Sequence, residues 1–274
     1  MKNIIVHILK FLFIVFIILI SLGVMYWVLM SSFKPHNEIL LSTYALPSKW
    51  IFRGYLFAFE ISPLLIFLRN SIIIASISTF LNVFIVGMGA YVFARFNFKG
   101  KNILFSVLSL SIMLPMASVM FPIFLVITRL NLYDSHIGLI LVYTALGLPF
   151  SLYILRSYFL SIPRQIEEAA IIDGASFYRI YLQIMLPLAK PGIATACILQ
   201  FLFAWNEFAY ALILTSSNDV RTAPVAIAYF TSAFTANYTA MFAAIVALVG
   251  PTIIAFVIFS KYVIKGLSEG AVKQ

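Results

Sequence analysis

Charged residues are scarce in this 274-residue chain. Asp, Glu, Lys and Arg together make up 10% of it, whereas a soluble globular domain carries about 25%. Hydrophobic residues reach 63% of the chain. A chain of this composition cannot hide its apolar surface from water, which excludes an ordinary water-soluble enzyme and predicts a protein whose solvent is lipid.

Residues that build disulfide frameworks, metal sites and nucleotide-binding loops are also few. Cys197 is the single cysteine, and the three histidines are scattered along the chain without zinc-ligand spacing. No G-x-x-x-x-G-K-[ST] phosphate loop occurs, and "GLSEGAVK" near the end has the wrong spacing. We therefore expect no disulfide, no metal, no cofactor and no ATP-hydrolysing site in this chain.

Apolar runs long enough to cross a bilayer, about 20 residues each, are the dominant pattern. The fold class that they predict is all-α, a polytopic membrane protein with one transmembrane domain over residues 1–274. The prolines Pro115 and Pro122 and the segment "GLPF" (147–150) predict bends, as expected of a cavity-lining bundle. Residues 222–240 are expected to form an outer loop or a half-helix. The six predicted spans lie at about 11–33, 70–94, 102–128, 135–157, 191–215 and 241–262.

The positive charge of the chain, a net +9, is interpreted as a topology signal. With the N-terminus inside, twelve of the 18 Lys and Arg residues fall in cytoplasmic segments. The positive-inside rule then places both termini in the cytoplasm. Membrane lipid is thus an expected partner and nucleic acid is not.

A polar segment interrupts the apolar pattern between the fourth and fifth spans, at residues 161–187. Ser161 is expected to cap a first helix, Gly174 to end it, and Ser176 to cap a second. The first helix is acidic, unlike most helices that lie on membranes. A groove on a cytoplasmic protein partner therefore fits the segment better. An apolar stripe at i, i+3, i+4 and i+7 marks the second helix: Phe177, Ile180, Tyr181 and Ile184.

The same segment resembles the "EAA loop" of permease subunits in ATP-binding-cassette (ABC) importers. The pattern stands here as "EAA" (168–170), Gly174 and "IMLP" (184–187). Four further segments resemble the carbohydrate, MalG-like branch of this family, in the same order along the chain. They are "SSFKPHNEI", "AYVFARFNFKGK", "AWNEFAYALILTSS" and "KYVIKGLSEGAVKQ".

The resemblance implies that residues 161–187 form a cytoplasmic coupling hairpin that docks on a separate ATPase. It also implies a second, homologous permease subunit, two ATP-binding subunits that hold ATP and Mg, and an extracytoplasmic solute-binding protein. Glu168 would pair with an arginine of the ATPase, and Gly174 would make the turn. The residues expected to carry the coupling are Glu168, Ala169, Ala170, Asp173, Gly174 and Ala175.

The function implied by the resemblance is import of a sugar or oligosaccharide across the cytoplasmic membrane of a prokaryote. The chain would be a transport subunit without enzymatic activity of its own. A permease for a non-sugar solute such as a glycerol phosphate is the first alternative. A secondary transporter is the second alternative, but such a protein needs ionisable residues near the bilayer midplane to bind its coupling ions. An intramembrane enzyme is the third, and its clustered Asp or His-Glu-x-x-His motif is absent.

Three further groups of residues are candidates for function. Glu207 is either a gate or path-lining residue or a boundary carboxylate paired with a neighbouring helix; Trp205 and Asn206 beside it are path candidates. By position in the family, Thr231, Ser232, Asn237 and Tyr238 would face the binding protein. The C-terminal tail, through Gly266, Gly270 and Lys273, would reach the ATPase interface, its alternative being a disordered terminus.

Overall fold

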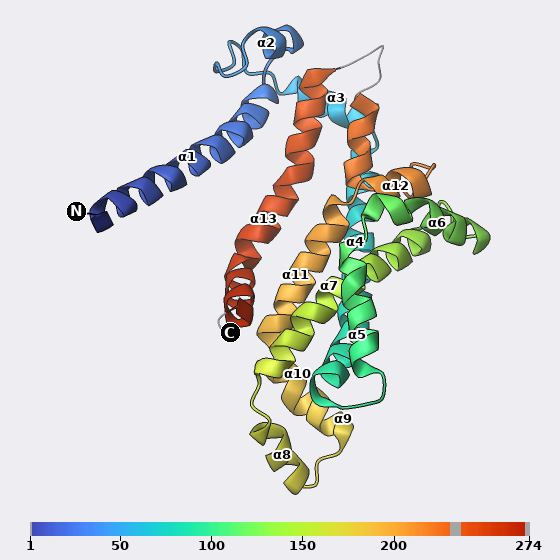
Figure 1. Ribbon diagram of the computed structural model, residues 1–274. Helices are drawn as coiled ribbons and strands as arrows, with labels where there is room; N and C mark the ends of the chain where they lie inside the picture. Colours follow the sequence, from blue (N-terminus) through green and yellow to red (C-terminus); the bar gives the residue numbers. More distant parts are fainter. Residues whose placement is uncertain (1, 231–236, 272–274) are drawn as a thin grey trace. The chain divides into compact units, whose positions relative to one another are not determined.

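The computed structural model describes residues 2–230 and 237–271, and every regular element in them is a helix (Figure 1). The prediction of an all-α membrane protein is thereby confirmed. Thr231, Ser232 and Lys273, three of the candidate residues, lie outside the described ranges. The chain divides into two compact units, which are described separately below.

The first unit comprises residues 1–65 and 225–251. Its long helix α1 is apolar on all sides, and none of its most apolar stretch is buried by the described chain, so its side chains suit lipid or a partner subunit. After α1, the Lys34 ammonium is buried and donates to the carbonyls of Ser42 and Thr43 at 2.6 and 3.1 Å. The helices of this unit are α1 (Lys2–Ser31), α2 (His36–Leu41), α3 (Arg53–Ile61) and the first part of α13 (Tyr238–Ala271).

The second unit comprises residues 66–224 and 252–274 and holds most of the helices. Its elements in chain order are α4 (Leu64–Arg95), α5 (Lys101–Leu110), η1 (Ser111–Met113), α6 (Met116–Arg129), α7 (His136–Ser161), α8 (Gln165–Ile172), α9 (Phe177–Arg179), the π-helix η2 (Ile180–Met185), α10 (Leu186–Leu188), α11 (Lys190–Asn206) and α12 (Ala209–Leu214). The 3-10 helix η3 (Ala223–Phe230) begins here and continues into the first unit, within the segment expected to be a loop or half-helix.

Three described helices are long and apolar enough to span a membrane: Val6–Ser31 of α1, α4 and α7. The number becomes five if each of two bent pairs is one span. One pair, Lys101–Met113 with Met116–Arg129, bends by 106° at Pro115, which cannot donate a backbone hydrogen bond. The predicted span at 102–128 is therefore a broken helix. The other pair, Phe177–Leu188 with Lys190–Asn206, bends by 73°. An apolar helix at Tyr238–Ile254 overlaps the predicted sixth span, and the count of six stays a prediction.

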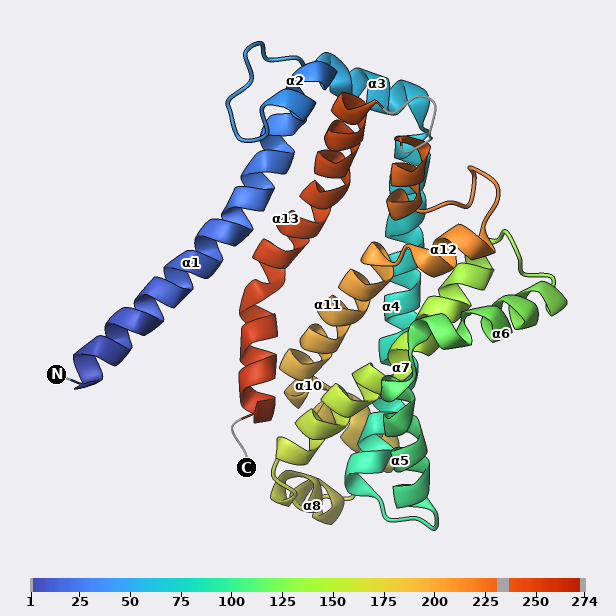
Figure 2. The same ribbon diagram turned by 45° about the horizontal axis from the view of Figure 1, so that its top comes forward.

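Polar side chains join α4, α7 and α11 where these helices pack together (Figure 2). Asn82 of α4 donates to the Thr144 carbonyl at 2.9 Å, and Gln200 of α11 donates to the Tyr143 carbonyl at 3.0 Å. Gly147 permits the second contact, since a Cβ there would lie 1.8 Å from the Gln200 Oε1. These bonds hold the helices in register, because in an apolar interior an unpaired amide is costly.

Candidate functional site

The polar segment folds as two short helical pieces joined by a tight turn at one end of the second unit (Figure 1). Gly174 has φ +75°, a left-handed conformation that favours glycine. Its N–H donates to the Ile171 carbonyl at 3.0 Å, and the Ala175 N–H donates to the Ala170 carbonyl at 2.9 Å. These two bonds make a Schellman motif, which ends α8 as the glycine in the sequence predicts.

The start of α8 differs from the sequence prediction. Ser161 was expected to cap it, but this residue is the last of α7, and its hydroxyl donates to the Tyr158 carbonyl at 2.8 Å. The helix begins at Gln165 instead, with Arg164 at its N-cap position. Pro163 stands in the intervening turn and explains the shift, because the residue before a proline is driven out of helical conformation. Ile162 accordingly is extended, with ψ 129°.

One face of α8 is left exposed by the rest of the described chain. Glu168 is exposed, and its carboxylate makes no hydrogen bond or ion pair with any residue in the described ranges. Ile171 and Ile172 are 62% and 86% exposed. Of the other predicted coupling residues, Ala169, Asp173 and Gly174 are also exposed, Ala175 is half-buried, and Ala170 is buried. This face therefore combines an unpaired carboxylate with exposed aliphatic side chains. Exposure of such apolar side chains to water is unfavourable.

The other face of α8 is held by charged and polar contacts that sequence reasoning missed. Glu167 forms an ion pair with Arg95, the last residue of α4. The Tyr91 hydroxyl donates to the same carboxylate at 3.2 Å, and Arg95 also donates to the Ile162 carbonyl at 2.6 Å. The one available signal was the isolation of these charges in an apolar chain, and it did not identify their pairing.

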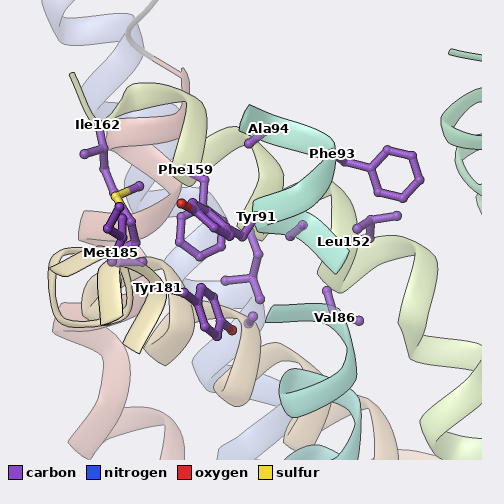
Figure 3. Close-up of a cluster of buried hydrophobic side chains, with 14 of the residues drawn as sticks. Val86, Tyr91, Phe93, Ala94, Leu152, Phe159, Ile162, Tyr181 and Met185 are labelled. Carbon is purple, nitrogen blue, oxygen red and sulfur yellow. The ribbon is translucent and has the colours of Figure 1, made fainter. Parts of the chain in front are cut away.

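Three of the four residues in the apolar stripe of the second helical piece face inward, whereas Phe177 is 42% exposed. Ile180 and Tyr181 are buried in a core formed with α4 and α7, and Ile184 packs against it. Figure 3 shows Tyr91, Phe159 and Tyr181 together in this core. The three inward-facing stripe residues are therefore not open to a partner, because their own chain covers them, and the expectation that the segment fits a groove on a cytoplasmic partner stays a prediction.

A pocket of about 330 Å³ opens between the end of α4, α8 and the second helical piece. Its lining includes the Arg95–Glu167 pair, Glu168 and the rings of Tyr91 and Phe177. Across residues 2–230 and 237–271, no cluster of three His, Cys, Asp or Glu side chains could hold a metal ion.

Glu207 lies at the break between α11 and α12, where its carboxyl group is buried. It accepts hydrogen bonds from the Tyr143 hydroxyl at 2.8 Å and from the backbone N–H groups of Tyr210 and Ala211 at 2.8 and 3.0 Å. The two N–H groups lie in the first turn of α12, where backbone donors have no acceptor within the helix, so the Glu207 side chain acts as a helix cap. This geometry corresponds to the second of the two alternatives for Glu207, a boundary carboxylate bound to a neighbouring helix.

The remaining candidates are placed as follows. Trp205 is buried and stacks on Phe201 with 5.8 Å between ring centroids, whereas Asn206 is exposed. Asn237 caps α13 by accepting from the Ala240 N–H at 3.1 Å, and the Tyr238 ring stacks on His36. Gly266 and Gly270 lie within α13, which continues to Ala271.

Asp134 joins two loops at the opposite end of α7 from the polar segment. Burial opposes ionisation of its carboxyl group, but the pKa is lowered overall because Ser216 and Ser217 donate to it. Their N–H groups lie 2.9 and 3.0 Å from Oδ1, and the Ser217 hydroxyl lies 3.1 Å away. The loop before α7 is thereby tied to the loop after α12.

Residues 83–268 match the family model described as "Binding-protein-dependent transport system inner membrane component". The chain belongs to this family. It is 36% identical over 248 residues to the diacetylchitobiose uptake system permease protein NgcG of Streptomyces coelicolor, with 90% of this chain and 82% of the relative covered. It is 38% identical over 255 residues to the trehalose transport system permease protein SugB of Mycobacterium tuberculosis, with 90% of each covered.

Solved structures agree on the fold of this permease. A bacterial ABC transporter involved in the import of the acidic polysaccharide alginate matches with a TM-score of 0.80 and 22% identity, over 95% of this chain and 97% of that one. The methionine ABC transporter MetNI matches with a TM-score of 0.61 and 18% identity, over 74% and 95%. The resemblance of the sequence to ABC importer permeases is confirmed, and the chain is a membrane component of a transport system.

Proposed function

We propose that this chain is the permease subunit of an ABC importer that moves a sugar or oligosaccharide across the cytoplasmic membrane of a prokaryote. The observation that carries the proposal is the exposed face of α8, on the EAA pattern of the family, where Glu168, Ile171 and Ile172 have no partner within the described chain. Such a face fits a groove on a protein partner. The sugar is inferred from the names of relatives such as NgcG and SugB.

The partner on α8 is a separate ATPase, two copies of which hold ATP and Mg; this chain holds neither and hydrolyses no ATP. Glu168 supplies the charge that an arginine of the ATPase would meet, and Ile171 and Ile172 supply the apolar contact. A second, homologous permease completes the pathway, and an extracytoplasmic solute-binding protein delivers the solute. Both termini lie in the cytoplasm under this proposal.

The remaining site proposals are narrower. Asn206 is the exposed member of the three path candidates; Trp205 and Glu207 would support the path from behind, since both are buried. Residues 231–232, with Asn237 and Tyr238, would face the solute-binding protein. The tail from Gly266 to Lys273 would reach the ATPase pair.

Uptake by the reconstituted complex tests the function. Proteoliposomes carrying both permeases and the ATPases are given MgATP inside and solute-loaded binding protein outside. Radiolabelled trehalose, diacetylchitobiose, an arabinooligosaccharide and glycerol 3-phosphate serve as probes. We expect ATP-dependent uptake of one of the sugars. Uptake of glycerol 3-phosphate alone would support the first alternative, and uptake driven by an ion gradient without ATP would contradict an ABC importer.

A further inference from the structure

We propose that Arg95 and Glu167 form an internal brace that makes the docking helix α8 move together with the spans α4 and α7. The proposal rests on the proposed function, because it assigns α8 as the element that the ATPase moves. In this scheme Glu167 and Arg95 are positioning residues that touch neither ATP nor solute. Glu168, the adjacent carboxylate, faces the partner instead.

The guanidinium of Arg95 connects three separate elements. It is the last residue of α4, it pairs with Glu167 in α8, and it donates to the Ile162 carbonyl directly after α7 at 2.6 Å. The Arg95 and Glu167 side chains are only 5% and 13% exposed. An arginine can serve both acceptors at once because its planar group presents several N–H donors in a fixed geometry. A lysine has no such fork.

Tyr91 strengthens the same connection one helical turn earlier in α4. Its hydroxyl donates to Glu167 at 3.2 Å, and its ring, which is 2% exposed, contacts Phe159 of α7 with 5.5 Å between centroids. The ring also lies 5.7 Å from Phe177 and 5.2 Å from Tyr181 in the second helical piece. Both arms of the polar segment are therefore attached to α4 by one residue.

This arrangement suits transmission of a displacement. Coupling between distant sites travels through packed side chains and bonded networks that move as rigid pieces. Only Ile162, Pro163 and Arg164 join α7 to α8, and a connection of three residues alone would let α8 swing when the ATPase moves. Removing one member of a buried ion pair leaves the other charge without its partner, so each single change should release the connection.

The experiment uses the whole complex with MgATP alone as the first probe. Spin labels are placed on α4 and on α8 through Phe84→Cys and Gln165→Cys, both exposed positions, in a Cys197→Ala background. Electron–electron resonance measures the distance between the labels with and without MgATP. We expect one unchanged distance in the parent protein. In Arg95→Ala and Glu167→Gln, MgATP should shift or broaden the distance distribution.

The second readout is the amount of solute moved per ATP hydrolysed, with the sugar that the wild-type complex takes up from the panel above. We expect both brace variants to lower this ratio by about fivefold or more, the lower end of coupling between linked sites. The double variant should be no worse than either single one, since both remove the same contact. Lys99→Ala, at an exposed basic residue nearby, should leave the ratio unchanged.

Each other outcome is decisive. Unchanged distances and an unchanged ratio in both brace variants would overturn the brace. Loss of the ATPase from Glu167→Gln would also overturn it, because Glu167 would then be a docking contact. If Arg95→Ala does not accumulate in the membrane, the brace is tested with Glu167→Gln and Tyr91→Phe instead, since both substitutions preserve the shape of the side chain. Retention of the ATPase by Glu168→Ala and Gly174→Val would instead mark failure of the docking proposal itself.

Discussion

The two faces of α8 differ sharply, although Glu167 and Glu168 are adjacent in the sequence. Glu167 forms an ion pair with Arg95 and accepts a hydrogen bond from Tyr91, both within its own chain. Ala170, on the same helix, is buried. Glu168 is exposed on the same side as Ile172, which is 86% exposed. The difference teaches that a coupling element needs two kinds of residue, those that fix it to the permease and those left open for the partner. Changes on the two faces should therefore fail in different ways.

The largest effect is expected from Gly174→Val, which disrupts both faces at once. A β-branched residue at φ +75° is strained by about 1–3 kcal/mol, although the space around Gly174 is open. We expect solute uptake and ATPase retention to fall strongly while the permease still inserts. Uptake in proteoliposomes and pull-down of the ATPase measure the two effects.

Gly100→Val is the matched control for this strain. Gly100 has φ +82°, also with open space around it, but it lies in the loop between α4 and α5. The Gly100→Val variant should lose stability to a degree similar to Gly174→Val and still retain the ATPase in the pull-down. Equal loss of the ATPase from both variants would mean that strain alone, not the turn of α8, explains the result.

A smaller effect is expected from Glu168→Ala, which changes the outward face alone. Removing one partner of a buried interfacial ion pair costs about 2–5 kcal/mol, against about 0–1 kcal/mol for an exposed pair. Retention of the ATPase should fall measurably, and the thermal stability of the isolated permease should stay the same. Binding of the purified ATPase to the permease, measured against salt concentration, checks this. Normal binding at all salt concentrations would remove Glu168 from the interface.

Glu207→Ala should act on stability more than on uptake per folded permease. The change leaves the Tyr143 hydroxyl and two N–H groups of α12 without their acceptor, at about 1–3 kcal/mol for each buried group. Asn206→Ala is the control, since Asn206 is exposed. Thermal denaturation of the detergent-solubilised protein compares the two. Unchanged stability with lost uptake in Glu207→Ala would favour the gate instead.

The smallest effect is expected at Asp134, far along the chain from α8. Its folded pKa lies below the usual value, so it stabilises the protein above the unfolded pKa of about 3.9. That contribution is lost as pH falls through the folded pKa. Asp134→Asn should lower stability slightly at neutral pH and remove this pH dependence below about pH 4. Denaturation curves across acid pH measure it; identical curves for both proteins would contradict the role of the Ser216 and Ser217 bonds.

Part of this molecule was predictable from sequence. The apolar runs and the glycine at position 174 each act locally, so composition and spacing were enough to predict an all-α membrane fold and the end of α8. Pro115 predicted a bend, but its size, 106°, depends on packing.

The inward contacts were not predictable, because they join residues far apart in the chain. Tyr91 lies 76 residues from Glu167, and nothing local specifies that pairing. An apolar stripe such as the one through Ile180 and Tyr181 can pack into the core of its own chain or against a partner, so the sequence alone did not show which of the two it contacts. Glu207 was ambiguous as well, because the groups that donate to its carboxylate are defined only once α7 and α12 are placed around it.

Crosslinking from the exposed face of α8 tests the central claim most directly. Ile172→Cys and, as control, Ile137→Cys at the far end of α7 are labelled with a benzophenone in a Cys197→Ala background; the two side chains are 86% and 59% exposed. Irradiation of the assembled complex should join the ATP-binding subunit to position 172 and not to position 137. A crosslink to that subunit from position 137, or the absence of a crosslink from both positions, would contradict the assignment of α8 as the docking element.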